Sequence, residues 1–268
     1  DFSAKIMVKV GQLNSKDFPA NKKYAIPLSI TGASNYSLIP SQRSAILLLN
    51  RSILSSVAKV SGGEGIRIKP VGMHTKAEWT IQMSAIYSSL TRSNLTTAYL
   101  SNGTGGEFYT RISSTAGIQV KNGRDGDDTW TQIPLQAGKW LHITYVHKDK
   151  KTTVYVNGKV QKVFENSAIT FGENSMIVVG NSGYRNDYLR EIRLWDKALT
   201  ESEINDYLYL PMDPATPHLI SYLPLSKEME TKDLKAPAGT ENVTTKARIE
   251  YVENVKFPAD ELVIANQE

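Results

Sequence analysis

Short alternations of apolar and polar residues recur along most of the chain, and clusters of Gly, Asn, Pro and Ser separate them. A period of two places successive side chains on opposite faces of a strand, so each alternation predicts a β-strand. From residue 53 onward the pattern predicts strands over residues 65–69, 79–87, 107–112, 117–120, 140–147, 152–156, 159–163, 176–179 and 189–195. Many short strands with turn signals between them are typical of an all-β sandwich.

The run at residues 79–87 has the clearest two-faced pattern. One parity carries Trp79, Ile81 and Met83, whereas the other begins with Thr80. We therefore expect a strand with one buried face and one wetter face.

The dipeptide Asn157-Gly158 separates the predicted strands 152–156 and 159–163. Both residues tolerate the positive φ angles of a type I′ turn, so the pair predicts a β-hairpin.

One helix is predicted, directly after residue 200. Thr200 and Glu203 have the spacing of a capping box, and Ile204, Tyr207 and Leu208 follow as an apolar stripe. We expect a short helix attached to the sandwich.

Beyond the helix, residues 219–225 and 247–252 are predicted to return to the sandwich as strands. Residues 258–268 are expected to form a tail.

The first 52 residues are expected to form a separate unit. They predict three strands, at residues 4–10, 24–30 and 44–49, which cannot close a sandwich alone. We expect a partial N-terminal β-sandwich domain over residues 1–52, and a larger sandwich over residues 53–268. The chain opens directly into a predicted strand, which suggests a removed signal peptide or a truncation.

Composition and charge narrow the class of protein. The 268 residues are 40% hydrophobic and include no cysteine, which excludes a wholly disordered chain, a disulfide framework and a thiol nucleophile. The longest apolar run, residues 45–49, is far shorter than the roughly 20 residues that span a membrane.

The net charge of +4 is unevenly distributed along the chain. Residues 1–52 hold seven cations and two anions, a balance of +5, and the rest of the chain holds 24 cations and 25 anions, a balance of −1. The cations of the first segment are spread singly, without the clusters and stacking aromatics of a nucleic-acid site. We therefore predict no nucleic-acid partner.

Four segments, taken in order, resemble the laminin G-like branch of the concanavalin A-like lectin/glucanase superfamily. They are WLHITYV (140–146), TTVYVNGK (152–159), MIVVGN (176–181) and EIRLWDKALTESEI (191–204). The resemblance extends from about residue 55 to about residue 257. It implies a jelly-roll sandwich of two antiparallel sheets over residues 53–268.

The segments KKYAIPLSITGAS (22–34) and SQRSAILLLN (41–50) resemble the later half of a small β-sandwich domain of unknown function. That domain precedes laminin G-like domains in surface lipoproteins of Bacteroidetes. The resemblance implies an exported protein of a polysaccharide-utilisation system, placed at the cell surface or in the periplasm. It implies attachment to the membrane only through a lipid anchor that is not present in this chain.

No catalytic residue is predicted. Retaining glycoside hydrolases of this superfamily carry Glu-x-Asp-x-x-Glu on one strand, and this spacing does not occur here. We interpret His142 as a structural strand residue.

The segment GRDGDDTW (123–130) is a candidate binding loop. Asp125, Asp127 and Asp128 are candidate Ca²⁺ ligands because carboxylates close together on a turn bind this ion through oxygen. The ring of Trp130 is placed to stack on a sugar. A solvated hairpin tip is the alternative.

Two further loops supply candidate carbohydrate-binding residues. The segment at 181–188 combines aromatic rings with planar polar groups, and the segment at 101–109 adds an amide and a ring; the candidates are Tyr184, Arg185, Asn186, Tyr188, Asn102 and Tyr109.

The sequence therefore predicts a non-catalytic carbohydrate-binding or adhesion protein of the bacterial surface, with a polysaccharide or glycan as ligand and outer-membrane proteins as candidate partners. Ca²⁺ is the one candidate cofactor. A structural or protein-interaction module and a divergent glycoside hydrolase are the alternatives.

Overall fold

A computed structural model describes most of the chain. It covers residues 7–9, 11, 17–18, 24–35, 37–49, 52–63, 65–72, 76–91, 96–99, 108–121, 126–165, 170–171, 175–180 and 184–265. For residues 42, 96–99, 127, 184 and 185 the description is limited to the backbone. The chain divides into two compact units, residues 1–53 and residues 54–268.

The first unit contains one β-hairpin. Strands β1 (Tyr24–Ser29) and β2 (Ser44–Leu49) pair antiparallel, and the 3₁₀ turn η1 (Pro40–Gln42) lies between them. The predicted strands 24–30 and 44–49 are confirmed. The predicted strand 4–10 is wrong for residues 7–9, which are exposed and not in a strand, and its other residues lie outside the described ones.

Both faces of this hairpin carry apolar side chains. Ile26 and Leu47 lie opposite each other on one face, while Ile46 and Leu48 belong to the other and are 68% and 74% exposed. A two-stranded sheet is marginal by itself in water. The prediction that this unit is part of a larger β-sandwich stays a prediction.

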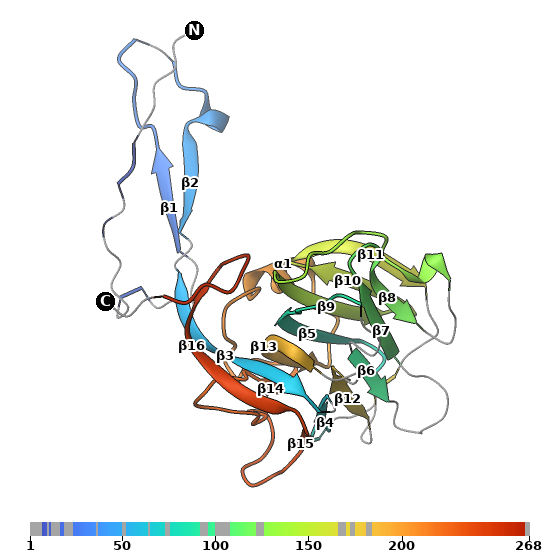
Figure 1. Cartoon of the computed structure of the whole chain (residues 1–268). Helices are drawn as coiled ribbons and strands as arrows, with labels where there is room; N and C mark the ends of the chain where they lie inside the picture. Colours follow the sequence, from blue (N-terminus) through green and yellow to red (C-terminus); the bar gives the residue numbers. More distant parts are fainter. Residues whose placement is uncertain are drawn as a thin grey trace. The chain divides into compact units, whose positions relative to one another are not determined.

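The second unit is built from two antiparallel sheets (Figure 1). The large sheet has eight strands in the order β11-β10-β9-β5-β13-β3-β16, with β14 also paired to β13. Its strands are β3 (Ile53–Gly62), β5 (Trp79–Ile86), β9 (Trp140–Lys148), β10 (Lys151–Val156), β11 (Lys159–Glu165), β13 (Tyr184–Trp195), β14 (Leu219–Leu223) and β16 (Arg248–Phe257).

The small sheet has six strands in the order β15-β4-β12-β6-β7-β8. They are β4 (Ile66–Ile68), β6 (Thr96–Tyr99), β7 (Phe108–Ser113), β8 (Gly117–Lys121), β12 (Met176–Val179) and β15 (Val243–Thr244). The remaining short elements of this unit are η2 (Asp127–Thr129) and α1 (Glu201–Asp206).

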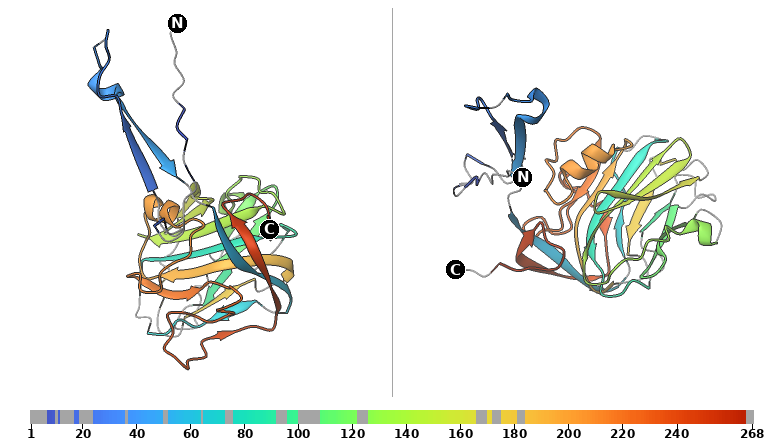
Figure 2. Two further views of the ribbon diagram at one scale, coloured as in Figure 1. Left: turned by 90° about the vertical axis from the view of Figure 1, so that its left-hand side faces the viewer. Right: turned by 90° about the horizontal axis from the view of Figure 1, so that it is seen from above.

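The two sheets lie face to face as the layers of a sandwich (Figure 1 and Figure 2). Trp79 of the large sheet meets Phe108 of the small sheet edge to face, with ring centroids 5.1 Å apart. Phe171 contacts the same indole from the side at 4.8 Å, and His147 stacks on it at 5.1 Å. One hydrophobic core therefore joins both layers, which confirms the predicted jelly-roll sandwich.

Strand β5 does not have the wetter face that its sequence predicts. All eight of its residues are buried, including Thr80, Gln82 and Ser84 on the face turned away from the core. Residues distant in sequence cover that outer face. The polar residues that alternate along β5 are therefore not exposed to solvent.

The predicted tail is also wrong for residues 258–265. This segment folds back along β16, where Lys256 N donates to Val263 O at 2.8 Å and Ala265 N donates to Asn254 O at 2.9 Å. Trp140 N donates to Asp260 O at 2.8 Å, so the segment also satisfies the first amide of β9. Residues 266–268 lie outside the described ones.

Both predicted local motifs are confirmed. Asn157 and Gly158 have φ angles of 51° and 75° in the turn that joins β10 and β11. Thr200 caps α1, since its side chain accepts from Glu203 N while the Glu203 side chain accepts from Thr200 N. Ile204 of the predicted stripe is buried.

Gly158 offers a test of the hairpin contact. Its φ is +75°, and an added Cβ would lie 2.0 Å from Oδ1 of Asn205, whose amide bonds Gly158 O and Glu201 O. We expect Gly158→Ala to lower the free energy of unfolding by about 2 kcal/mol or more in urea denaturation.

Gly138 is the matched control, because its φ of +76° is the same but nothing lies within 4 Å of an added Cβ. Gly138→Ala should cost less, since it carries the backbone strain alone. Equal losses in the two variants would show that the Asn205 contact contributes nothing.

Candidate functional site

The outer face of the large sheet is covered by residues 196–213, which we call the cover segment. Leu199, Ile204 and Met212 of this segment pack with Trp195 and Tyr222 in a second hydrophobic cluster outside the main core. The cover segment therefore closes the outer face of the large sheet over β5, β13 and β14, while a pocket of about 450 Å³ remains beside it over β9, β10 and β11.

A buried ionic network anchors the cover segment. Glu191 sits at an irregularity of β13 with a φ of +57°, and its carboxylate accepts from Arg193 at 2.5 Å and from Tyr222 Oη at 3.0 Å. Arg190 lies 3.5 Å from the same carboxylate. The two guanidinium groups and the carboxylate are almost inaccessible to solvent.

The guanidinium groups also bind the main chain of the cover segment. Arg190 donates to Tyr209 O at 2.8 Å, and Arg193 donates to Tyr207 O at 3.1 Å and to Leu210 O at 2.5 Å. Buried carbonyl groups without partners are costly, so these bonds fix the path of the segment. The network has a structural role, and it leaves Glu191 without the exposure that a catalytic carboxylate needs.

Polar side chains of β5 and β9 fill the space beneath the cover segment. His142 Nδ1 lies 2.6 Å from Ser84 Oγ, and Trp195 Nε1 donates to Gln82 Oε1 at 2.9 Å. The cavity beside them has a volume of about 10 Å³, enough for at most one water molecule. His142 is thus a hydrogen-bonded structural residue, as the sequence indicates.

Burial, together with the charges of Arg190 and Arg193, lowers the pKa of His142 to about 3. Burial lowers the pKa of His147 to about 4. Both imidazoles are therefore neutral in the folded protein near neutral pH.

The outer face of the small sheet carries the polar and aromatic side chains of β7. Phe108 and Ile112 of this strand are buried in the core, whereas Tyr109 and Arg111 are half-buried. Because side chains alternate along a strand, Tyr109 and Arg111 point to the outer face.

The strand register extends this surface across β8. Arg111 pairs with Gln119 and Tyr109 pairs with Lys121, and Gln119 in turn pairs with Trp130 through an isolated bridge. Directly opposed residues of antiparallel strands place their side chains on the same face. We call these five residues the β7–β8 face.

Neighbouring side chains support the geometry of the β7–β8 face. The Arg111 guanidinium lies 5.4 Å from the ring centroid of Tyr109, and Arg111 Nε donates to Tyr109 Oη at 3.4 Å. Gln119 Nε2 donates to Thr129 Oγ1 at 2.8 Å, just before Trp130. The face is thus held by contacts within the protein.

Two of the sequence-predicted residues, Tyr109 and Trp130, come together on this face. Arg111, Gln119 and Lys121 are not among the residues that the sequence predicts for a site. The alternation in residues 108–113 could have indicated Arg111, but the pairing with β8 is a tertiary feature.

The predicted calcium loop is only partly described. Asp128 is exposed, whereas Asp125 and the Asp127 side chain lie outside the described residues. Lys162 Nζ donates to Asp128 O at 2.8 Å and to Trp130 O at 2.7 Å, which places a positive charge on two main-chain oxygens that a cation would use. These contacts do not favour calcium here, and the calcium site stays a prediction.

No group of three or more His, Asp or Glu side chains in the described part of the chain could hold a metal.

The segment predicted as a loop at residues 181–188 belongs, from residue 184 onward, to β13 of the large sheet. Tyr188 pairs with Ile86 of β5, so it lies on the large sheet rather than beside Tyr109. Asn186 is exposed with a φ of +62°, while neighbouring Asp187 is buried and accepts from Ser88 N at 2.9 Å. The side chains of Tyr184 and Arg185, and all of Asn102, lie outside the described residues.

A family model described as the concanavalin A-like lectin/glucanases superfamily, of the laminin G-like type, matches residues 61–205, more than half of the chain. The chain belongs to this superfamily. No curated protein sequence matches it. The matched residues begin in β3 and end in α1, so they span most of both sheets of the lectin-like sandwich.

Solved structures agree with the superfamily fold. A proposed carbohydrate-binding protein from Bacteroides ovatus is 18% identical, with 92% of this chain and 72% of that chain covered and a TM-score of 0.59. A heptameric SAP-like pentraxin from Limulus polyphemus is 14% identical, with 74% of this chain and 94% of that chain covered and a TM-score of 0.48. At 18% identity, the likeness to the Bacteroides ovatus protein establishes the fold alone.

In the described residues of this superfamily member, no helix is long and apolar enough to cross a bilayer.

Substitution of Glu191 tests the ionic network. Glu191→Ala leaves Arg190 and Arg193 buried without their carboxylate, so we expect it to lower the free energy of unfolding by about 3–5 kcal/mol. The control is Glu253→Ala, which removes an exposed ion pair with Lys227 and should cost less than about 1 kcal/mol. Urea denaturation measures both, and similar losses would contradict an anchoring role.

The half-buried His142 and the buried His147 predict a loss of stability in acid. The folded-state pKa values of His142 and His147 lie below the ordinary value near 6.5, so the unfolded chain binds these protons first as the pH falls. The free energy of unfolding should therefore fall from about pH 6.5 toward pH 4, by up to about 1.4 kcal/mol per pH unit for each imidazole.

In His142→Gln we expect this pH dependence to become clearly shallower, because one of the two proton-linked groups is removed. Urea denaturation of both proteins between about pH 7 and pH 4.5 measures the slopes. Identical slopes would show that His142 is not held neutral by the fold.

Proposed function

We propose that this protein is a non-catalytic glycan-binding protein and that its β7–β8 face contacts the sugar. The observation that carries the proposal is the strand register, in which Tyr109 and Arg111 of β7 share one sheet face with Trp130, and Gln119 and Lys121 of β8 lie between β7 and Trp130. The sequence predicts both aromatic residues as candidate carbohydrate-binding residues.

The side chains of this face suit carbohydrate. Aromatic rings offer flat apolar surfaces to the C–H faces of sugars, and the guanidinium group of half-buried Arg111 can bond neighbouring hydroxyls. Gln119 is buried and supports the face from within through its bond to Thr129. Trp130 and the β7 strand are separated by two strand spacings, or about 10 Å. That separation favours an oligosaccharide over a single sugar.

Two observations support a binding role over hydrolysis. The cover segment closes the outer face of the large sheet around Glu191, and the Glu191 carboxylate is held there by two arginines and Tyr222. The chain also has no Glu-x-Asp-x-x-Glu strand. A divergent hydrolase would release sugar from a polysaccharide, and this is an outcome that the binding experiment can detect.

We further propose that the protein acts at the bacterial surface as part of polysaccharide utilisation, with outer-membrane proteins as candidate partners. The resemblance of residues 22–50 to a domain of Bacteroidetes surface lipoproteins supports this placement. The likeness to a proposed carbohydrate-binding protein from Bacteroides ovatus is in line with it.

The β7–β8 face can be tested with a glycan array followed by calorimetry on the full chain. We expect binding of at least one plant or host polysaccharide. Tyr109→Ala and Trp130→Ala should each weaken it about tenfold or more, because each removes a stacking ring. Circular dichroism of each variant checks that the sandwich is intact.

Tyr188→Ala is the matched control, since Tyr188 is a half-buried tyrosine on the large sheet. It should leave affinity unchanged if the β7–β8 face is the site. Loss of binding in Tyr188→Ala alone would move the site to the large sheet, and no binding to any glycan would leave a structural or protein-interaction module. Titrations with Ca²⁺ and with EDTA decide whether the ion contributes.

A further inference from the structure

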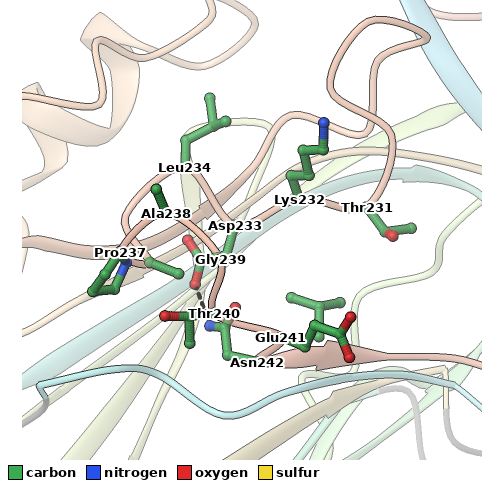
Figure 3. A pocket seen from close by; sticks show the side chains of 12 residues that line it. Thr231, Lys232, Asp233, Leu234, Pro237, Ala238, Gly239, Thr240, Glu241 and Asn242 are labelled. Atoms are coloured by element: carbon green, nitrogen blue, oxygen red, sulfur yellow. Dashed lines mark hydrogen bonds between the residues drawn. The ribbon is translucent and has the colours of Figure 1, made fainter.

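The segment between β14 and β15 forms an open pocket of about 610 Å³ (Figure 3). Its volume lies within the roughly 300–1,000 Å³ of small-molecule sites in proteins. The pocket is lined by residues 231–234 and 236–243. These residues lie beyond the part of the chain that the family model matches.

The pocket is distant from the β7–β8 face in the order of strands. Strand β15, which follows the pocket segment, is at one edge of the small sheet, and β8 is at the other edge. A ligand in the pocket therefore contacts a different surface from a ligand on the β7–β8 face.

The Asp233 carboxylate fixes the pocket segment. It is 7% exposed and accepts four hydrogen bonds, from Ser221 Oγ at 2.7 Å, Tyr222 N at 2.8 Å, Asn242 Nδ2 at 2.8 Å and Lys235 N at 3.0 Å. Figure 3 shows Asp233 and Asn242 joined within the pocket wall. A carboxylate so fully bonded holds both ends of the segment together.

Main-chain bonds complete the walls. Lys69 N donates to Asn242 O at 2.8 Å, and Asn242 Nδ2 donates to Lys69 O at 3.1 Å, which ties the segment to the chain after β4. Thr240 N donates to Pro237 O at 3.0 Å in a turn at the far end. The pocket is thus formed without a ligand, which lowers the entropy lost on binding.

The lining combines hydroxyl groups with small apolar surfaces (Figure 3). Thr231 and Thr240 supply hydroxyls, while Leu234 and Pro237 supply apolar contacts. Hydroxyls both donate and accept hydrogen bonds, as the hydroxyls of a sugar do.

The charged groups that line the pocket do not favour an anionic ligand. These groups are the ammonium of Lys232 and the carboxylates of Asp233 and Glu241. A negatively charged ligand would meet more negative than positive charge, so the pocket favours a neutral ligand.

We propose that this pocket is a second binding site, which takes a neutral, hydroxyl-rich ligand of the size of a short saccharide. The site rests on its own contacts and does not depend on the β7–β8 face.

The experiment is a titration of the ¹⁵N-labelled full chain, followed by amide NMR. The probes are xylohexaose, mannohexaose and cellohexaose, with hexagalacturonate as the anionic control. We expect saturable shifts of the Gly239, Thr240 and Asn242 amides with at least one neutral probe and none with the anion.

Thr240→Arg is the blocking variant, because Thr240 is exposed and lines the pocket. It should weaken the shifts at the pocket about tenfold or more in apparent affinity. Thr244→Arg is the matched control, an exposed threonine of β15 outside the lining, and it should bind as the parent does.

Tyr109→Ala separates this site from the proposed function. Pocket shifts that persist in Tyr109→Ala and disappear in Thr240→Arg support the second site. Shifts confined to β7 and β8, or no shift with any neutral probe, would overturn it. Equal binding of hexagalacturonate would overturn the neutral class of ligand, whatever happens at the β7–β8 face.

Discussion

The Glu191 carboxylate, held between Arg190 and Arg193, is the interaction on which the arrangement of the second unit depends. Burying three charges is costly, and it is tolerated because each charge is paired and hydrogen-bonded. The positive φ of Glu191 directs the carboxylate to both guanidinium groups, which in turn bond the carbonyls of the cover segment. A local irregularity in β13 thereby fixes a long connection over the large sheet.

Covering the large sheet determines which surfaces remain for a ligand. The outer side chains of β5 and β9 are used in internal hydrogen bonds, and the space beside them holds no more than one water molecule. The small sheet carries the β7–β8 face near one edge, and the pocket fixed by Asp233 lies next to the other. Both candidate ligand sites are associated with the small sheet, and each is held by contacts within the protein. On the large sheet, an open pocket remains over β9, β10 and β11 beside the cover segment.

Much of the fold could be predicted from the sequence because its signals are local. The type I′ turn at Asn157-Gly158 and the capping box of Thr200 depend on residues a few positions apart, and both are found as predicted. The errors arise where distant contacts decide. The polar side chains of β5 are buried because the cover segment lies over them. Residues 258–265 are held in place by main-chain hydrogen bonds to β16 and to Trp140.

From the amino-acid sequence alone, the jelly-roll class, many of the strands and the aromatic candidates Tyr109 and Trp130 could be predicted, whereas β3, β6 and β15 were not. Tertiary structure alone decided that these two share a sheet face with Arg111, that Tyr188 belongs to the other sheet, and that Asp233 closes a pocket. The physical reason is that a period of two fixes which side chains share one face of one strand. It carries no information on which strands become neighbours, and that choice is made by packing and hydrogen bonds between residues far apart in the chain.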